Sequence, residues 1–197
     1  MRPDRTLYAR QRVLVIGSAP GVVLPSVDAY DVSICANAAP RILVDAQRLP
    51  DTQIVTGYMT SLDYRTPEHV DLITGLHIPS VWVLETFQGI ESVQREYDRR
   101  GITWDVMRRI EQQDWADIVQ EVCGQPLGRH VLDGSDCEQS VSTGLFCACF
   151  AFYAGAETVT LSGISWGMRP HITGDTEAWD ALVAAYGDRV REVPLCV

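Results

Sequence analysis

Residues 13–21 read VLVIGSAPG, and this short stretch decides the fold class. Val13 to Ile16 form a continuous apolar run, which is typical of a strand buried on both faces of a parallel sheet. A turn of small residues, Gly17 to Gly21, follows directly. Because ligands bind beyond the carboxyl ends of the strands in such sheets, this turn is the first candidate for a binding site.

The residues of this turn allow two interpretations. The small residues Gly17, Ser18 and Ala19 let a ligand approach the backbone, whose free amides can face a phosphate. The spacing differs from the G-x-G-x-x-G fingerprint and from a P-loop, and Pro20 has no amide to donate. A plain tight turn explains the same residues equally well, so this turn alone does not decide the function.

Apolar runs recur along the chain and alternate with segments of helical character. Further strands are expected at residues 31–35, 53–56, 81–84, 158–161 and 190–197. Helices are expected at residues 40–49, from Thr66 onward, at 141–154 and at 177–186. This alternation predicts an α/β fold, a Rossmann-like α/β/α sandwich around a mostly parallel central sheet.

The charged segment from residue 88 to residue 122 interrupts this alternation. Its apolar residues come near helical spacing, so we expect two amphipathic helices with a break at Gly101. A loop is expected from residue 124 to residue 136. The chain is thus predicted to be one domain over residues 1–197, with a helical insertion or cover at about residues 88–135.

Composition limits the classes of partner. The 197 residues carry a net charge of −10, which argues against a nucleic-acid partner. All 16 basic residues are arginine, which excludes a Walker or Schiff-base lysine. The six cysteines form no C-x-x-C pair, so no metal site is expected. A polar N-terminus and the lack of a membrane-length apolar run predict a cytoplasmic protein with reduced thiols, and a homo-oligomer is left open.

Three further positions are candidates for contact with a ligand. Asn37 follows the second expected strand, where its amide can read a base or sugar, or can simply cap a turn. Ser142, Thr143 and Gly144 open an apolar helix, whose N-terminal amides can hold a phosphate or carboxylate; ordinary N-capping explains them equally well. Another strand-end turn holds Ser162, Gly163 and Ile164, and it too reads as either a binding turn or a generic one.

His171 is the candidate base. It lies in a polar loop just after Arg169, and a histidine that titrates near neutral pH suits the removal of a proton from a sugar hydroxyl. A lone histidine in a loop is more often a surface residue. His130 is the second candidate.

The order of these motifs carries more information than any one of them. A Gly-x-x-Pro turn after the first strand is followed by a cysteine and an asparagine at the end of the second. Farther on come a Ser-Thr-Gly helix start, a strand closing in Leu-Ser-Gly-Ile, a histidine, an aspartate before a helix, and a final Leu-Cys. In this sequence they are Gly17–Pro20, Cys35, Asn37, Ser142–Gly144, Leu161–Ile164, His171, Asp175 and Leu195–Cys196.

In this order the motifs resemble the bacterial sialyltransferases of glycosyltransferase family 42, and more distantly family 29. The resemblance implies a GT-A-like variant of the fold, a CMP-activated sialic acid or related keto-sugar acid as donor, and a glycan or glycolipid acceptor. It implies inversion without a metal or other cofactor, with His171 as base. It also implies that Gly17–Pro20 and Asn37 contact cytidine or phosphate, that Ser142–Gly144 hold the donor, and that Ser162–Gly163 line the ribose.

The sequence departs from the family at one place. Only residues 165–170 separate the Leu-Ser-Gly-Ile turn from His171, and the family's paired tyrosines have no counterpart there. Arg169 is the candidate replacement, because a guanidinium neutralises the charge on a leaving phosphate. Two alternatives stay open: a nucleotide-binding or interaction module that has lost transfer, and a pterin pyrophosphokinase-like enzyme, which also begins with a Gly-Ser/Asn-x-Pro turn.

Overall fold

A computed structural model describes residues 1–56, 70–85, 89–124, 141–164 and 174–195. Within these ranges seven strands form one sheet in the order β5-β4-β3-β2-β1-β6-β7, and every neighbouring pair is parallel. The strands are β1 Arg12–Ile16, β2 Val32–Ala36, β3 Thr52–Thr56, β4 Ser80–Leu84, β5 Val106–Ile110, β6 Thr158–Ser162 and β7 Val190–Val193. The predicted α/β fold with a parallel central sheet is confirmed.

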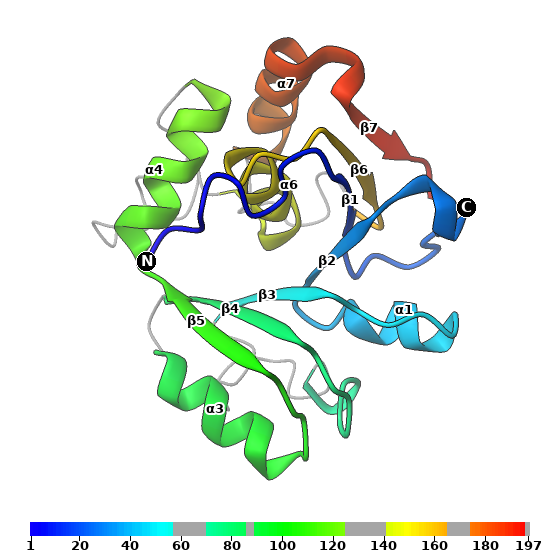
Figure 1. The fold of residues 1–197 in the computed structure, drawn as a ribbon, viewed down its shortest axis with the longest axis vertical. Helices are drawn as coiled ribbons and strands as arrows, with labels where there is room; N and C mark the ends of the chain where they lie inside the picture. Colours follow the sequence, from blue (N-terminus) through cyan, green and yellow to red (C-terminus); the bar gives the residue numbers. More distant parts are fainter. Residues whose placement is uncertain (57–69, 86–88, 125–140, 165–173, 196–197) are drawn as a thin grey trace.

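Helices cover both faces of this sheet. Figure 1 shows α4, α6 and α7 on one face and α1 and α3 on the other. Their bounds are α1 Pro40–Asp45, α3 Ile90–Arg99, α4 Gln112–Cys123, α6 Thr143–Tyr153 and α7 Gly174–Tyr186. No helix within the described ranges is long and apolar enough to cross a membrane.

The first strand is buried on both sides, as its apolar run predicts. Val13 and Val15 belong to the large core beneath α6, whereas Leu14 and Ile16 pack with Leu43 of α1 on the opposite face. Successive side chains of a strand point to opposite faces, so a strand between two helical layers needs apolar residues at every position.

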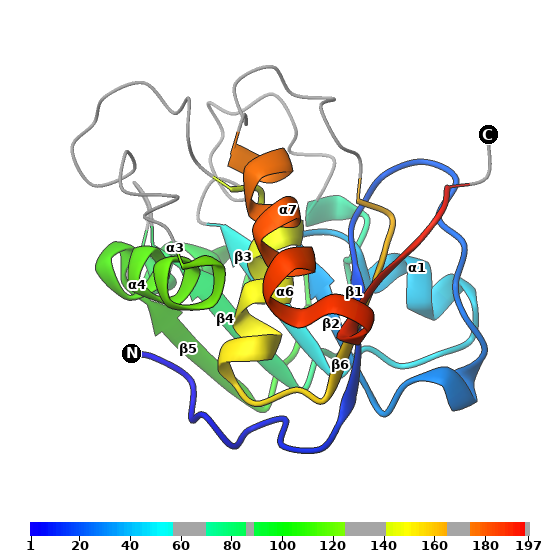
Figure 2. The ribbon, with the colours of Figure 1, turned by 90° about the horizontal axis from the view of Figure 1, so that it is seen from above.

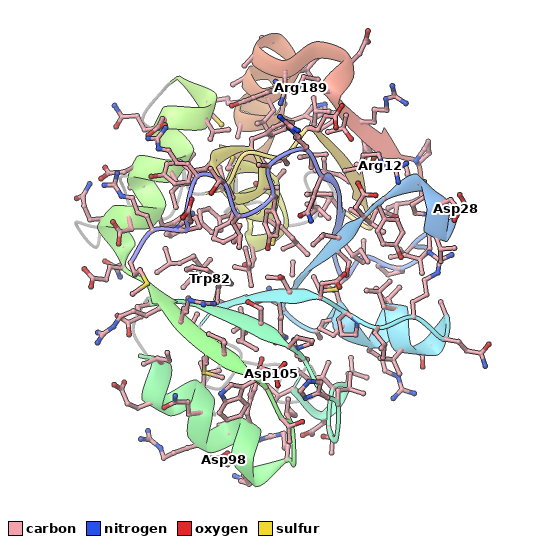
Figure 3. The ribbon with its side chains drawn as sticks, viewed as in Figure 1. Arg12, Asp28, Trp82, Asp98, Asp105 and Arg189 are labelled. Atoms are coloured by element: carbon pink, nitrogen blue, oxygen red, sulfur yellow. The ribbon has the colours of Figure 1, made fainter. Side chains whose placement is uncertain are left out.

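The start of β1 is held by a surface ion pair. Arg12 donates to the Asp31 carboxylate at 2.7 Å and to the Asp28 carbonyl oxygen at 2.8 Å, at the corner labelled in Figure 3. Hydrogen bonds from Arg12 lower the pKa of Asp31 to about 2. The pair joins the beginning of β1 to the residue that precedes β2, and so fixes where these strands start.

Helix α6 lies in the middle of the larger core. All its residues from Gly144 to Tyr153 are buried, which matches the apolar helix predicted at residues 141–154. The Ser142 hydroxyl accepts a hydrogen bond from the Leu145 amide at 3.2 Å and caps the helix. The Phe150 ring meets the Trp82 ring edge-on, with centroids 5.1 Å apart. These contacts anchor the helix against β4.

The segment predicted as two helices contains a strand between them. Helices α3 and α4 confirm the two helices and the break at Gly101, but Val106–Ile110 is β5, paired with β4 from Val106 opposite Ser80 to Ile110 opposite Leu84. The predicted helical insertion or cover at about residues 88–135 is therefore wrong at Val106–Ile110, which extend the sheet. An edge strand tolerates charged residues such as Arg108 and Arg109, and these hid the strand pattern.

Three smaller differences concern the bounds of elements. Helix α1 ends at Asp45, short of the predicted residue 49, and Gln47 follows with a left-handed φ of 58°. Helix α7 begins at Gly174, before the predicted residue 177, and β7 ends at Val193. Residues 66–69 of the helix predicted from Thr66 lie outside the described residues, while Val70 and Asp71 are helical; of the loop predicted at residues 124–136 only Gly124 is described.

Candidate functional site

The topology singles out one edge of the sheet. From β1 the chain builds outward through β2 to β5 on one side, and it later returns to add β6 and β7 on the other side. The carboxyl ends of β1 and β6 therefore meet at the point where the strand order reverses, which is where open α/β sheets bind ligands. Figure 2 shows the N-terminal ends of α6 and α7 side by side.

The two predicted turns after β1 and β6 are joined by backbone hydrogen bonds. The Gly17 amide donates to the Ser162 carbonyl oxygen at 2.8 Å, and the Ala19 amide donates to the Gly163 carbonyl oxygen at 3.0 Å. A Cβ atom on Gly17 would lie 2.2 Å from that Gly163 oxygen. Only glycine fits there, so Gly17 is required for this close approach of two backbones.

The start of α6 reaches the same point through Ile164. A Cβ atom on Gly144 would lie 2.5 Å from Cδ1 of Ile164, and one on Gly17 would lie 2.7 Å from the same atom. The Ile164 side chain is buried between these two glycines. The turn after β1, the turn after β6 and the start of α6 thus meet around one side chain. We call the three segments Gly17–Pro20, Ser142–Gly144 and Ser162–Ile164 together the glycine junction.

The start of α6 has backbone amides that the helix itself does not pair; Thr143 is partly exposed, and Gly144 is buried. Ser142 caps Leu145, and the helix geometry gives the Thr143 and Gly144 amides no partner within the helix. Neither amide donates a hydrogen bond to any other acceptor among the described residues. Unpaired amides at the positive end of a helix favour an anion such as a phosphate or carboxylate.

A buried carboxylate that the sequence did not assign to the site lies beside this helix start. Asp175, in the first turn of α7, is 5% exposed, and its Oδ1 accepts a hydrogen bond from the Ser142 amide at 2.6 Å. Burial raises the pKa of Asp175, and the bonds from Ser142 oppose that rise. The sequence showed an acid early in a helix, but no spacing rule connects it to a residue 33 positions away.

Ser162 has a structural partner. Its hydroxyl is fully buried and donates to the Val23 carbonyl oxygen at 2.7 Å. This bond holds the segment after the β1 turn against β6. The Ser162 side chain therefore has no exposed surface that could make the predicted contact with a ribose. In the β1 turn, by contrast, Ser18 and Pro20 are exposed.

Asn37 joins the ends of β2 and β3. It adopts a left-handed φ of 51°, and its Oδ1 accepts a hydrogen bond from the Thr56 amide at 3.2 Å. Gln53 donates to the Asn37 carbonyl oxygen and accepts a hydrogen bond from the Tyr97 hydroxyl at 2.8 Å. The oxygen thus caps a turn, and the side-chain nitrogen has no acceptor among the described residues. Sequence reasoning missed Gln53 and Tyr97, since polar residues inside apolar segments gave no motif.

Comparison with known proteins identifies structures of similar fold. No family model and no curated protein sequence matches this chain. Solved structures do match. The alpha-2,3-sialyltransferase Cst-I from Campylobacter jejuni is 13% identical with a TM-score of 0.57, covering 99% of this chain and 80% of that one. The sialyltransferase CstII from the same organism, in complex with CMP-3FNeuAc, is 14% identical with a TM-score of 0.53, covering 92% of this chain and 79% of that one.

The chain has a sialyltransferase-like fold. The similarity extends over 92–99% of this chain. The fold predicted from the order of the motifs is therefore confirmed, although the identity of 13–14% is too low to carry residue roles across.

The predicted catalytic residues are not among those that the structure describes. His171 and Arg169 lie outside the described residues, as does the second candidate histidine, His130. Within the described ranges no group of three or more histidine, cysteine, aspartate or glutamate side chains is placed to hold a metal ion. The predicted base, its arginine neighbour and the absence of a metal requirement stay predictions.

Proposed function

We propose that this protein is a glycosyltransferase that uses a CMP-activated sugar, either sialic acid or a related keto-sugar acid. The observation that carries the proposal is the glycine junction at the switch point of a sialyltransferase-like fold. Among the solved structures of similar fold, CstII from Campylobacter jejuni is in complex with CMP and with a trisaccharide acceptor. A glycan or glycolipid is accordingly the proposed acceptor.

The donor is proposed to bind at the start of α6. The Thr143 and Gly144 amides have no acceptor among the described residues, and they suit the phosphate of CMP or the carboxylate of the sugar, because both are anions. Ser18 is exposed in the β1 turn, and the side-chain nitrogen of Asn37 has no acceptor among the described residues; both supply donors for cytidine or phosphate oxygens. In this way neutral groups and a helix dipole hold an anionic donor on an acidic protein.

The proposed reaction is a single displacement with inversion. His171 accepts the proton of the acceptor hydroxyl, whose oxygen attacks the anomeric carbon as the bond from that carbon to CMP breaks. The departing phosphate gains negative charge, and the Arg169 guanidinium is proposed to stabilise it. No metal or other cofactor takes part in this scheme. Transfer that is undiminished in excess chelator is the expected result, and loss of transfer on chelation would contradict it.

Binding and transfer test the proposal separately. Calorimetry with CMP and with a CMP-sugar should show binding of both, and no binding of either at millimolar concentration would contradict the donor class. His171→Ala should keep CMP binding but lose transfer by about 100-fold or more, since a general base contributes on the order of 10²–10⁴ in rate. His77→Ala is the matched control, because His77 is an exposed histidine paired with Asp105 at 3.6 Å.

The same measurements distinguish the alternatives. CMP binding without transfer or donor hydrolysis would indicate a module that has kept the site and lost the chemistry. Activity that depends on ATP and magnesium would indicate a pterin pyrophosphokinase-like enzyme. Full transfer by His171→Ala would remove the proposed base while leaving the donor class intact.

A further inference from the structure

Two free thiols meet where three helices pack together. The Sγ atoms of Cys123, at the end of α4, and Cys149, in the middle of α6, are 3.7 Å apart. Cys123 Sγ also lies 3.9 Å from the Ala178 carbonyl oxygen of α7. We propose that Cys123 and Cys149 form an oxidisable dithiol, a modification site where peroxide produces a reversible disulfide between α4 and α6.

The geometry of the pair needs little change to form the bond. A disulfide brings its sulfurs to about 2.05 Å, so these two sulfurs must approach by about 1.7 Å. Cys123 is the last residue of α4, and Gly124 follows in the left-handed conformation with a φ of 70°. The final turn of a helix lacks the hydrogen bonds of the interior and adjusts more easily, so Cys123 is the partner that moves.

The two thiols differ in reactivity. The hydrogen bond from Cys149 lowers the pKa of Cys123, and that same bond, followed by burial, raises the pKa of Cys149. Cys123 also keeps a 9% exposed surface, whereas Cys149 has none. Since the thiolate is the nucleophile, Cys123 reacts with peroxide first and Cys149 resolves the product.

The chemistry balances in two steps. The Cys123 thiolate attacks one oxygen of hydrogen peroxide, the O–O bond breaks, and the products after one proton is taken up are a sulfenic acid and water. The Cys149 sulfur then attacks the Cys123 sulfur, the S–O bond breaks, and water leaves with the Cys149 proton. The two thiols lose two electrons to the peroxide. A dithiol reductant reverses the change.

The disulfide would link two parts of the larger core that flank the start of α6. It would close the chain between residues 123 and 149, a span that contains Ser142–Gly144 of the glycine junction. A covalent link lowers the conformational entropy of the unfolded chain and so favours the folded state. Oxidation should therefore raise the melting temperature by several degrees, and reduction should restore the original value.

The other described cysteines differ from this pair in their burial. Cys35 and Cys147 are fully buried, and burial raises the pKa of both thiols. Cys147 lies two residues from Cys149 on α6, which makes Cys147→Ser the matched control for Cys149→Ser. Cys137 and Cys196 lie outside the described residues, so both are replaced by serine in the protein used for the test.

The experiment treats that folded protein with hydrogen peroxide, blocks the remaining thiols and identifies the linked peptides by mass spectrometry. The expected product contains one disulfide between Cys123 and Cys149, has lost about 2 Da, and returns to the reduced mass with dithiothreitol. Cys149→Ser should instead leave Cys123 as a sulfenic acid that dimedone traps, and Cys147→Ser should still form the disulfide.

Two results would overturn the proposal. The first is a folded protein, judged by its circular dichroism, in which peroxide links neither cysteine. The second is a disulfide that uses Cys35 or Cys147, or one whose yield is unchanged in Cys149→Ser. Neither readout depends on donor binding, so the dithiol and the proposed transferase function are tested independently.

Discussion

The glycine junction and the outer strands β4 and β5 are stabilised by different means. At the junction two backbones meet directly, with the Gly17 amide 2.8 Å from the Ser162 oxygen and no room for a Cβ atom. At the outer strands a side-chain contact adds to the backbone pairing: the Arg108 guanidinium lies over the Trp82 ring at 5.2 Å, near the centre of Figure 3. The glycine junction should therefore not tolerate a single added methyl group. The outer strands should tolerate the truncation of a side chain to alanine.

The largest expected effect comes from adding that methyl group at the junction. Gly17→Ala places a Cβ atom 2.2 Å from a backbone oxygen that cannot rotate away, so it should lower the free energy of unfolding by about 3 kcal/mol. Urea denaturation measures the loss. Gly89→Ala is the control, because its Cβ atom would meet only the ends of two flexible side chains, the carboxylates of Glu91 at 2.9 Å and Glu85 at 3.4 Å. Equal losses in the two variants would contradict the proposed intolerance.

The next effect concerns the carboxylate that supports the junction. Asp175→Ala removes the acceptor of the Ser142 amide and leaves that amide without a partner, at a cost of about 2 kcal/mol. Loss of CMP affinity should accompany the loss of stability, because the start of α6 loses its link to α7. Unchanged stability would show that another acceptor replaces Asp175.

A smaller, pH-dependent effect separates the charge of Asp175 from its hydrogen bond. Burial raises the pKa of Asp175 above its usual 3.8, so the folded protein holds this proton more tightly than the unfolded chain does. The stability that the carboxyl group contributes is greatest below its unfolded pKa and decreases as the pH rises through its folded pKa. Asp175→Asn keeps an oxygen acceptor without the charge.

The stability of Asp175→Asn relative to the unmodified protein should therefore improve as the pH rises from about 4 to about 7. Denaturation at several pH values measures the trend. A trend in the opposite direction would mean that the hydrogen bonds to Ser142 outweigh burial and that the pKa is lowered.

The smallest effect is expected at the outer strands. Arg108→Ala removes a cation from the face of the Trp82 ring and should cost less than about 1 kcal/mol, the usual size of such a contact at a partly exposed site. Arg109→Ala is the matched control, since its guanidinium lies 3.7 Å from the Glu85 carboxylate and not over a ring. A loss as large as that of Gly17→Ala would remove the distinction between the two regions.

The sequence predicted β1, the turn after it and β4, but it missed β5, and the reason is physical. A buried parallel strand such as β1 is apolar at every position, and the turn after it contains glycine where backbones meet, so both leave a pattern in the sequence. The edge strand β5 is half exposed and contains two arginines. The spacing of its apolar residues was therefore interpreted as that of a helix. Asp175 and Gln53 could not be assigned because their partners are brought to them by the fold, not by spacing along the chain.

The pairing of β1 with β6 also has a consequence for how the protein is made. Residues 12–16 leave the ribosome early and can pair with β2, but their other neighbour comes from residues 158–162. The contact between Gly17 and Gly163 can therefore form only after all the residues between them have emerged. A nascent chain stalled before β6 would hold one open side of β1, a target for chaperones until the last strands arrive.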